Sequence, residues 1–305
     1  MKLRTLRTRL CLKAIVAAAA VVAVAGINPR TTDQLKPTLR RHRPADIHRV
    51  RDQTTSESYN WSGYAISGAK GSVTDVKGSW VVPTVTCANT RNGYASFWVG
   101  IDGWNSSTVE QIGTDSDCVN LLGTTTNTPT YYAWFEFYPN GAYLIGNYNR
   151  SGACISGCVF PGDKISAEVI ASGSSPKGIR GGQAFTVTIT DETRGWSFTT
   201  TSTVPNAQQS SAEWIAETPY GCRTASGYCQ LSDFGSVYYG QGYTGVGDTA
   251  YATMNGVTKA LGSFNSSVQE AVMVNYPSGT TTMAQPSYLD STGTNFDVQW
   301  WNAGP

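Results

Sequence analysis

Hydrophobic and polar residues alternate over short runs through most of this chain, from residue 58 to the C-terminus. The runs Lys77–Val82, Tyr131–Tyr138 and Ala184–Thr190 are rich in aromatic and β-branched residues, which favour strands. Turn sequences such as Phe160-Pro-Gly-Asp163 separate these runs. Only the stretch from Asn265 to Val274 is a candidate for a longer amphipathic helix. The pattern predicts an all-β domain, built as a sandwich or a barrel.

One of these runs, Ser211–Glu217, carries two carboxylates. Alternation places Glu213 and Glu217 on one face of the predicted strand, with Ile215 between them, and Trp214 on the opposite face. Acidic residues are depleted in strands, so two on one face need a reason. Either the face is solvated or the acids belong to a functional site, and the alternation alone does not decide between the two.

The N-terminus has the pattern of an export signal. Five basic residues precede or border an apolar run of 12 residues, Ala14–Ala25, which ends in the small-x-small cleavage pattern Ala23-Val-Ala25. A helix that spans a bilayer needs about 20 apolar residues, so a retained membrane anchor is the weaker alternative. We expect residues 1–25 to be a signal peptide, and the rest of the chain to be secreted and free of membrane contact once the signal is removed.

The composition changes twice after the signal. Residues 26–57 hold seven basic and four acidic residues, a net charge of +3, together with three prolines and no aromatic residue. This composition argues against a packed core, so the segment is predicted to be a propeptide, with a disordered linker as the alternative. Residues 58–305 hold ten basic and seventeen acidic residues, a net charge of −7. Their length is consistent with one all-β domain, which we expect to be a monomer.

The cysteines fit an exported protein. Cys11 lies in the predicted signal, and six cysteines remain, an even number that suggests three disulfides. Fifteen pairings are possible, and the simplest is between sequence neighbours. A zinc site is the weaker alternative, because residues 58–305 contain no histidine and no CxxC. The six residues are Cys87, Cys118, Cys154, Cys158, Cys222 and Cys229.

The same lack of histidine restricts the chemistry of the predicted domain. Both histidines, His42 and His48, lie upstream of residue 58, which excludes Ser–His and Cys–His catalysis and histidine-ligated zinc within the domain. No Gly-rich phosphate loop is present, and the negative charge argues against nucleic acid. We therefore expect no metal and no cofactor. The remaining candidates are carboxylates and amides in aromatic-rich strands: Asp102, Gln111, Glu136, Glu213 and Glu217.

Four motifs follow one another in the order of a known family. They are Ser96-Phe-Trp-Val-Gly-Ile-Asp-Gly103, Val109-Glu-Gln-Ile-Gly113, Ala133-Trp-Phe-Glu-Phe-Tyr-Pro139 and Ala212-Glu-Trp-Ile-Ala-Glu217. Taken together they resemble the glutamic peptidases, the eqolisins, over nearly all of the domain from Tyr59 onward. Any one of the motifs alone would be weak evidence, whereas the four in this order are specific.

The resemblance implies a sandwich of two large antiparallel sheets, of the concanavalin or jelly-roll kind, and an acid endopeptidase that acts on polypeptides. It places the catalytic pair at Gln111 and Glu217, and Trp98, Asp102 and Glu136 along the substrate cleft. The chemistry agrees with these residue types. One glutamate can activate a water as a base and then protonate the leaving amine, and a glutamine amide can donate to the oxyanion.

Two alternatives stay open from the residues alone: a jelly-roll glycoside hydrolase and a carbohydrate-binding module. A strand separates Glu213 from Glu217 by about 13 Å, too far for a glycosidase pair, although Glu136 and Glu217 on different strands could meet its spacing. The charge reversal at residue 57 predicts that the basic propeptide binds the acidic domain. We expect acid to release it and self-cleavage near residues 52–58.

Overall fold

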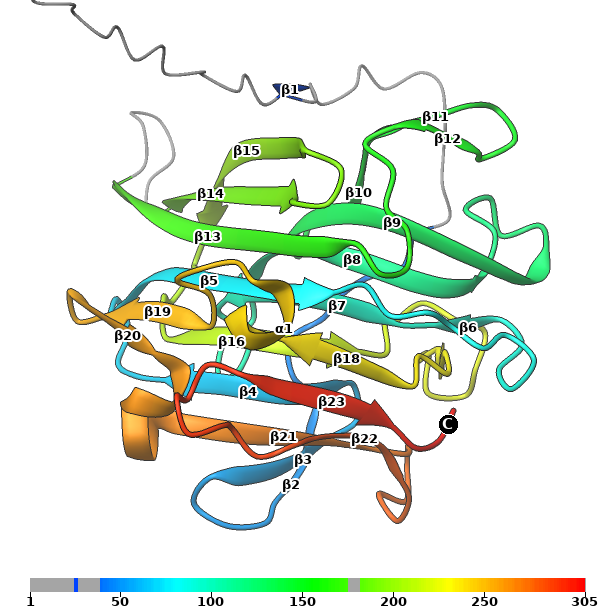
Figure 1. Cartoon of the computed structure of the whole chain (residues 1–305). Coiled ribbons are helices and arrows are strands. Elements are labelled where there is room, and N and C mark those ends of the chain that lie inside the picture. The colour runs from blue at the N-terminus through cyan, green and yellow to red at the C-terminus, as the bar shows by residue number, and fades with distance from the viewer. Residues whose placement is uncertain (1–24, 27–38, 175–181, 305) are drawn as a thin grey trace, which may run out of the picture.

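The computed structural model describes residues 25–26, 39–174 and 182–304. The predicted signal peptide lies almost wholly outside these residues, as does the first part of the predicted propeptide. The described chain is nearly all β, as the alternating pattern predicts, and most strand pairs are antiparallel. In Figure 1, β13 to β15 lie at the top of the molecule and β2 and β3 at the bottom, with β16 between them.

The first sheet has the strand order β2-β3-β21-β4-β16-β7-β8-β9-β10. Its strands are β2 (Ile47–Val50), β3 (Thr55–Ser58), β21 (Val268–Val274), β4 (Trp61–Ser67), β16 (Ser211–Glu217), β7 (Ser96–Ile101), β8 (Val109–Val119), β9 (Thr126–Tyr138) and β10 (Tyr143–Ile145). All pairs are antiparallel except β3 with β21. β16 is thus an inner strand, with partners on both edges.

The second sheet has the order β22-β23-β18-β5-β13-β14-β15, and β19 and β20 extend it beside β18 along β5. Its strands are β22 (Thr282–Pro286), β23 (Phe296–Trp300), β18 (Ser236–Tyr239), β5 (Val73–Val81), β13 (Lys164–Ser174), β14 (Gly182–Asp191), β15 (Trp196–Pro205), β19 (Tyr251–Met254) and β20 (Val257–Ala260). β22 also pairs with β21, which joins the two sheets at one place.

Short elements complete the described chain. They are β1 (Ala25–Gly26), β6 (Gly93–Tyr94), β11 (Asn147–Tyr148), β12 (Cys154–Ser156), β17 (Gln230–Leu231), the helix α1 (Gln241–Thr244) and the 3₁₀ helix η1 (Leu261–Ser267). No helix in the described ranges has the length and apolar character needed to cross a membrane.

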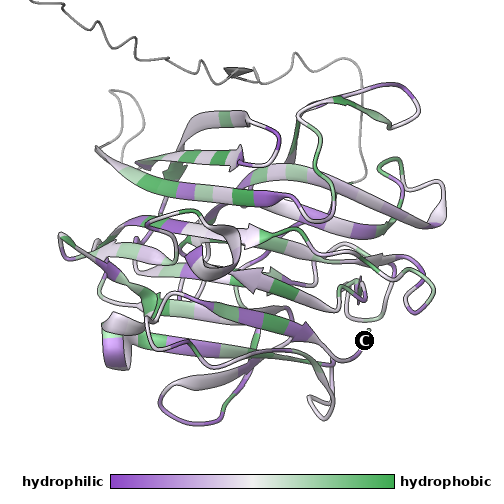
Figure 2. Cartoon of the chain, in the orientation of Figure 1, coloured by the Kyte–Doolittle hydropathy of each residue, from purple (hydrophilic) through white to green (hydrophobic). Residues whose placement is uncertain are grey.

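The two sheets pack face to face around the main hydrophobic core. Val99 and Trp214 contribute to it from the first sheet, and Val76 and Val187 from the second. A hydrogen bond joins the two sheets: the Trp214 indole N–H on β16 donates to the carbonyl of Lys77 on β5 over 2.8 Å. The alternation that fills this core is visible as changing colour along β13 and β14 in Figure 2. The predicted antiparallel sandwich of two large sheets is confirmed.

A second hydrophobic cluster lies on the outer face of the first sheet. Its central members are Trp61, Trp98, Trp134 and Ile215. Residues from upstream of position 58 cover it, since Leu39, Ala45 and Ile47 pack against these rings. Apolar residues therefore fill both faces of this sheet, and the outer face is covered by the segment that the sequence assigns to the propeptide.

The structure corrects two local predictions. The stretch from Asn265 to Val274 is not a helix: after η1 it forms strand β21, which pairs with β3, β4 and β22. The segment 26–57 was predicted to lack packing, yet β2 and β3 are strands of the first sheet, and Glu57 is buried. Arg49 and Arg51 both bind the Glu57 carboxylate, at 2.8 and 2.7 Å.

Three disulfides link the six predicted cysteines, and each joins sequence neighbours. The pairs are Cys87–Cys118, Cys154–Cys158 and Cys222–Cys229, so the simplest of the fifteen pairings is confirmed. The first pair ties the loop after β5 to the buried strand β8, and the other two close short surface loops.

Candidate active site

Strand β16 directs its two acids to the outer face of the first sheet. Trp214 belongs to the core between the sheets, whereas Ile215 belongs to the outer cluster, as alternation predicts. Glu213 and Glu217 share the face of Ile215, and both are buried. The interpretation of this face as solvated is therefore wrong, and the two acids need partners or protons.

Strands β8 and β9 bring the predicted glutamine beside a glutamate. Gln111 lies directly opposite Glu136, and residues opposite each other on antiparallel strands have Cβ atoms about 5 Å apart. Two residues further along β8, Gly113 lies beside Trp98 of β7. A Cβ at Gly113 would lie 2.5 Å from the Trp98 Cβ, so the glycine of the Gln-x-Gly motif leaves room for that side chain.

Three of the five predicted catalytic and cleft residues converge on one dipeptide, His42-Arg43. The Gln111 Nε2 donates to the carbonyl oxygen of His42 over 2.9 Å. The backbone N–H of His42 donates to the Glu136 Oε2 over 2.9 Å, and the backbone N–H of Arg43 donates to the Glu217 Oε1 over 3.1 Å. All of these side chains are buried under the segment. Gln111, Glu136 and Glu217 therefore form one site that binds peptide backbone.

Trp98 holds the carboxylate of Glu217. Its indole Nε1 donates to the Glu217 Oε2 over 2.9 Å, and its ring packs edge-on against Trp61 with centroids 4.9 Å apart. Both Glu217 oxygens thus have defined donors, one from the sheet and one from the bound segment. Trp98, which the sequence placed along the cleft, lies beneath it and fixes the orientation of the catalytic candidate.

Burial raises the pKa values of the carboxyls in the site above their usual range. It raises the pKa of Glu217 far above its ordinary value, with the nearby Glu136 adding to the effect and the Arg43 N–H opposing it. Burial likewise raises the pKa of Glu136 to about 8, against the hydrogen bond from His42 and the charge of Arg41. A carboxyl with a raised pKa can give a proton as well as take one, which is what acid–base catalysis requires.

His42 is the residue of this site that sequence reasoning missed. Its imidazole stacks on the Trp134 ring with centroids 3.6 Å apart and planes 7° from parallel, and its Nδ1 lies 3.5 Å from the Glu217 Oε2. Burial lowers the pKa of His42 to about 3. Its position upstream of residue 58 had placed it outside the domain, and nothing in the local sequence signals the contact.

The acids beside the site could have been found from the sequence. On β8, Gln111, Asp115 and Asp117 share one face by alternation. The Tyr132 hydroxyl contacts both aspartates, with 2.8 Å to the Asp115 Oδ2 and to the Asp117 Oδ2. Burial raises the pKa of Asp115 to about 7. The strand pattern of β8 therefore places further carboxyls with raised pKa values on the same face of the sheet as Gln111.

Asp102 lies apart from the dipeptide. Its two carboxylate oxygens accept four hydrogen bonds from the loop that leads into β16. The donors are the backbone N–H groups of Gln208, Gln209 and Ser210, at 2.6, 2.8 and 2.9 Å, and the Ser210 hydroxyl at 3.1 Å. We therefore assign Asp102 to holding this loop, in place of the substrate contact that the motif suggested.

Replacement of Asp102 by alanine is expected to lower the free energy of unfolding by about 3–5 kcal/mol, because three backbone N–H groups lose a charged acceptor. Asp102→Asn keeps one acceptor oxygen and should lose less. Urea unfolding measures both losses, and kinetics on a peptide substrate should show an unchanged KM. A raised KM with unchanged stability would return Asp102 to the substrate cleft.

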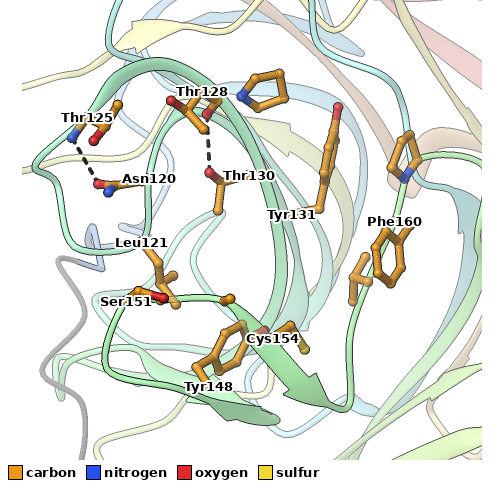
Figure 3. A pocket seen from close by; sticks show the side chains of 15 residues that line it. Asn120, Leu121, Thr125, Thr128, Thr130, Tyr131, Tyr148, Ser151, Cys154 and Phe160 are labelled. Atoms are coloured by element: carbon orange, nitrogen blue, oxygen red, sulfur yellow. Dashed lines mark hydrogen bonds between the residues drawn. The ribbon is translucent and has the colours of Figure 1, made fainter.

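A separate cavity of about 520 Å³ opens at the end of β9 (Figure 3). Side chains from the β8–β9 turn, the β11–β12 hairpin and Phe160 line it, and none of the fifteen lining residues is charged. None of the five predicted catalytic and cleft residues reaches it. The described residues also contain no group of three or more metal-ligating side chains.

Comparisons with known proteins agree with the motifs. The model of the peptidase A4 family matches residues 59–290. Aspergillopepsin-2 of Aspergillus niger is 28% identical over 212 residues, which cover 61% of this chain. The match spans 64% of that protein's length, slightly less than two thirds.

Two solved structures share the fold. Scytalido-glutamic peptidase, solved with a peptide-based transition state analog, aligns with a TM-score of 0.55 at 19% identity. SCP-B, a member of the eqolisin family of peptidases solved with the tripeptide Ala-Ile-His, aligns with a TM-score of 0.56 at 18% identity. Each alignment covers 80% of this chain and 98% of the other.

Proposed function

Because this chain belongs to the peptidase A4 family, the eqolisins, we propose that it is an acid endopeptidase that cuts polypeptides with Gln111 and Glu217. One observation carries the proposal. The two side chains bind the two polar groups of a single peptide bond, the carbonyl of His42 and the N–H of Arg43. A peptidase needs a donor at the carbonyl oxygen and a proton source at the amide nitrogen.

The reaction uses one water and no group from outside the chain. The ionised Glu217 takes a proton from water, and the water oxygen adds to the carbonyl carbon. The Gln111 Nε2 donates to the oxyanion that forms. The protonated Glu217 then gives its proton to the amide nitrogen, and the C–N bond breaks. Within the described chain the Gln111 Oε1 accepts no hydrogen bond, so it is available to orient the attacking water.

Glu136 and Trp98 position the reactants. Glu136 accepts from the backbone N–H of the residue that supplies the carbonyl, so it fixes the register of the bound chain. Trp98 holds one Glu217 oxygen, which leaves the other directed at the amide nitrogen. A carboxylate held at hydrogen-bond distance from the group it protonates meets the geometric condition for acid–base catalysis.

Activity should be confined to acid pH because several carboxyls surround the oxyanion. Asp115 and Glu136 have raised pKa values of about 7 and about 8. Below these values both are neutral, so neither repels the oxyanion. As the pH rises through this range, both ionise and repel it. The three disulfides and the predicted signal support an extracellular site of action, where we expect a monomer.

The test is digestion of a denatured protein and of polysaccharides by the purified chain at about pH 3 and pH 7. We expect new amino termini at pH 3, few at pH 7, and no effect of a metal chelator. Release of reducing sugars without new amino termini would replace the proposal with the glycoside hydrolase alternative, and binding of polysaccharide without any hydrolysis would favour the carbohydrate-binding module.

A further inference from the structure

The peptide bond between His42 and Arg43 occupies the site as a substrate bond would. Its carbonyl oxygen receives the Gln111 Nε2 at 2.9 Å, and its nitrogen lies 3.1 Å from the Glu217 Oε1. A segment that only blocked the cleft could present any of its atoms to the dyad. Here both atoms of one bond are matched to the two groups that hydrolysis assigns to them.

Contacts on each side fix this register. Before the bond, Arg41 and Tyr220 exchange two backbone hydrogen bonds of 3.0 and 2.9 Å, and the His42 ring stacks on Trp134. After the bond, the Arg43 guanidinium lies over the Tyr220 ring, 4.3 Å from its centroid. The N–H of Ala45 donates to the carbonyl of Gly103 over 3.0 Å. A shift by one residue would break all of these contacts together.

The chain makes different kinds of contact with the domain before and after the His42–Arg43 bond. Downstream, β2 and β3 belong to the first sheet, and β3 pairs with β21. Upstream, Leu39 packs on the outer cluster, and Arg40 binds the carbonyl of Gly221 and the Tyr94 hydroxyl over 2.9 and 3.0 Å. A cut at this point would free the upstream segment, whose described strand β1 pairs only with the outer strand β15 of the second sheet, and would leave the first sheet whole.

We propose that the protein cuts its own chain between His42 and Arg43, and that residues 43–57 remain part of the catalytic domain. The inference rests on the proposed function. Water adds its oxygen to the His42 carbonyl carbon, the C–N bond breaks, and the proton passes through Glu217 to the new amine of Arg43. The products are a carboxylate on His42 and an ammonium on Arg43.

This position differs from the boundary expected from composition. The sequence predicts cleavage near residues 52–58, where the charge reverses. A cut there would fall in β3 or in the turn before it, where Asp52 accepts the backbone N–H groups of Thr54 and Thr55. Gln111 and Glu217 instead contact residues 42 and 43.

The experiment follows the full chain, purified uncut at neutral pH and stepped to about pH 3.5, by intact mass and N-terminal sequencing. We expect a new N-terminus that begins Arg43-Pro44-Ala45. Because the bond is already seated, the rate should stay first-order and unchanged over a tenfold dilution. Arg43→Pro removes the N–H that faces Glu217 and should block this cut, whereas Arg43→Lys keeps the N–H and should still be cut.

A denatured protein added to the same samples separates the two proposals. Digestion of the added protein with a cut elsewhere in the chain, or with no cut, overturns the inference and leaves the proposed function standing. The same holds if the self-cleavage rate rises in proportion to protein concentration. Failure to digest the added protein under any condition overturns both. A cut after His42 that persists in Glu217→Gln assigns the cleavage to another protease and also overturns the inference.

Discussion

Replacing Glu217 by glutamine should lower the rate of peptide hydrolysis by a factor on the order of 10⁴, because one side chain serves as both base and acid. Glutamine has nearly the same shape, and its one amide oxygen can accept from either the Trp98 indole or the Arg43 N–H, which bind different oxygens of the glutamate. It can neither take a proton from water nor give one to the amide nitrogen. The measurement is kcat/KM on a denatured protein or peptide at about pH 3.

Glu213 supplies a matched control. It lies on the same face of β16, is equally buried, and burial raises its pKa well above the ordinary value. A carboxyl that keeps its proton is well imitated by an amide, so Glu213→Gln should fold and retain activity. Gln111→Ala should cost about 10²–10³ in kcat, the scale for an oxyanion donor. Equal losses in Glu213→Gln and Glu217→Gln, or full activity in the latter, would refute the assignment.

Replacing His42 by phenylalanine should keep residues 39–45, which lie in the predicted propeptide, docked on the site in acid; we call this docked state closed and the undocked state open. Burial lowers the His42 pKa from 6.5 to about 3, so the closed state is favoured above pH 6.5 and loses this advantage as the pH falls toward 3. The ratio of closed to open molecules should change by a factor on the order of 10³ across that range. Phenylalanine can stack on Trp134 as the imidazole does, but it does not titrate.

The groups around the imidazole agree with a closed state that weakens as the pH falls. The charged or titratable groups near it are Glu217, Glu136, Asp115, Arg41 and Arg43. An ionised Glu217 would favour a charged imidazole, but burial raises the pKa of Glu217 as well, which reduces that charge. Protonation of His42 therefore weakens the docking of its ring, so that water reaches the His42–Arg43 bond while the contacts of Arg41 and Arg43 with Tyr220 still hold it.

The observable is the rate of self-cleavage between pH 7 and pH 3. In the wild-type chain it should rise as the pH falls, and in His42→Phe it should be slower at pH 3.5 by a factor on the order of 10²–10³. His48→Phe is the control, because His48 contacts the Tyr59 hydroxyl outside the cleft. Identical pH profiles for His42→Phe and the wild type would show that acid acts through another group.

The contacts that hold residues 39–57 on the domain also differ from those expected from composition. Composition predicts that its arginines bind cleft carboxylates. In the structure Arg49 and Arg51 pair with Glu57 of their own segment, and Arg43 lies on an aromatic ring. Salt should therefore affect release only weakly, since stacking and buried hydrogen bonds are little screened.

The strands could be predicted because they depend on short-range patterns, whereas the proposed catalytic pair, Gln111 and Glu217, comes from the resemblance of four motifs to a known family. Alternation on β16 places Glu217 beside Ile215 whatever the rest of the chain does. Alternation on β8 similarly separates Gln111 from the core. The docking of His42 depends on a surface made by Trp134 and Trp98, far away in the sequence. A segment with few apolar residues needs no core of its own when another surface supplies one.

The stretch that forms β21 is a helix candidate in the sequence for a related reason. Gln269, Glu270, Ala271 and Met273 favour helices in isolation, but pairing with β3 and β4 provides hydrogen bonds on both edges. Local propensity is a weak preference that such tertiary contacts override. For Asp102 the motif was not enough. Its position in the motif does not reveal that its carboxylate accepts from the 208–210 loop.

The parallel pairing of β3 with β21 sets a limit on how this protein can be produced. A recombinant version that begins at residue 58 would remove three of the four residues of β3 and leave Glu270, Ala271 and Val272 without partners on this edge. Ala271 and Val272 are buried and apolar, and an exposed apolar strand edge promotes aggregation between molecules. A version that begins at residue 43 would keep this edge covered, and it is the shorter form to choose for soluble expression.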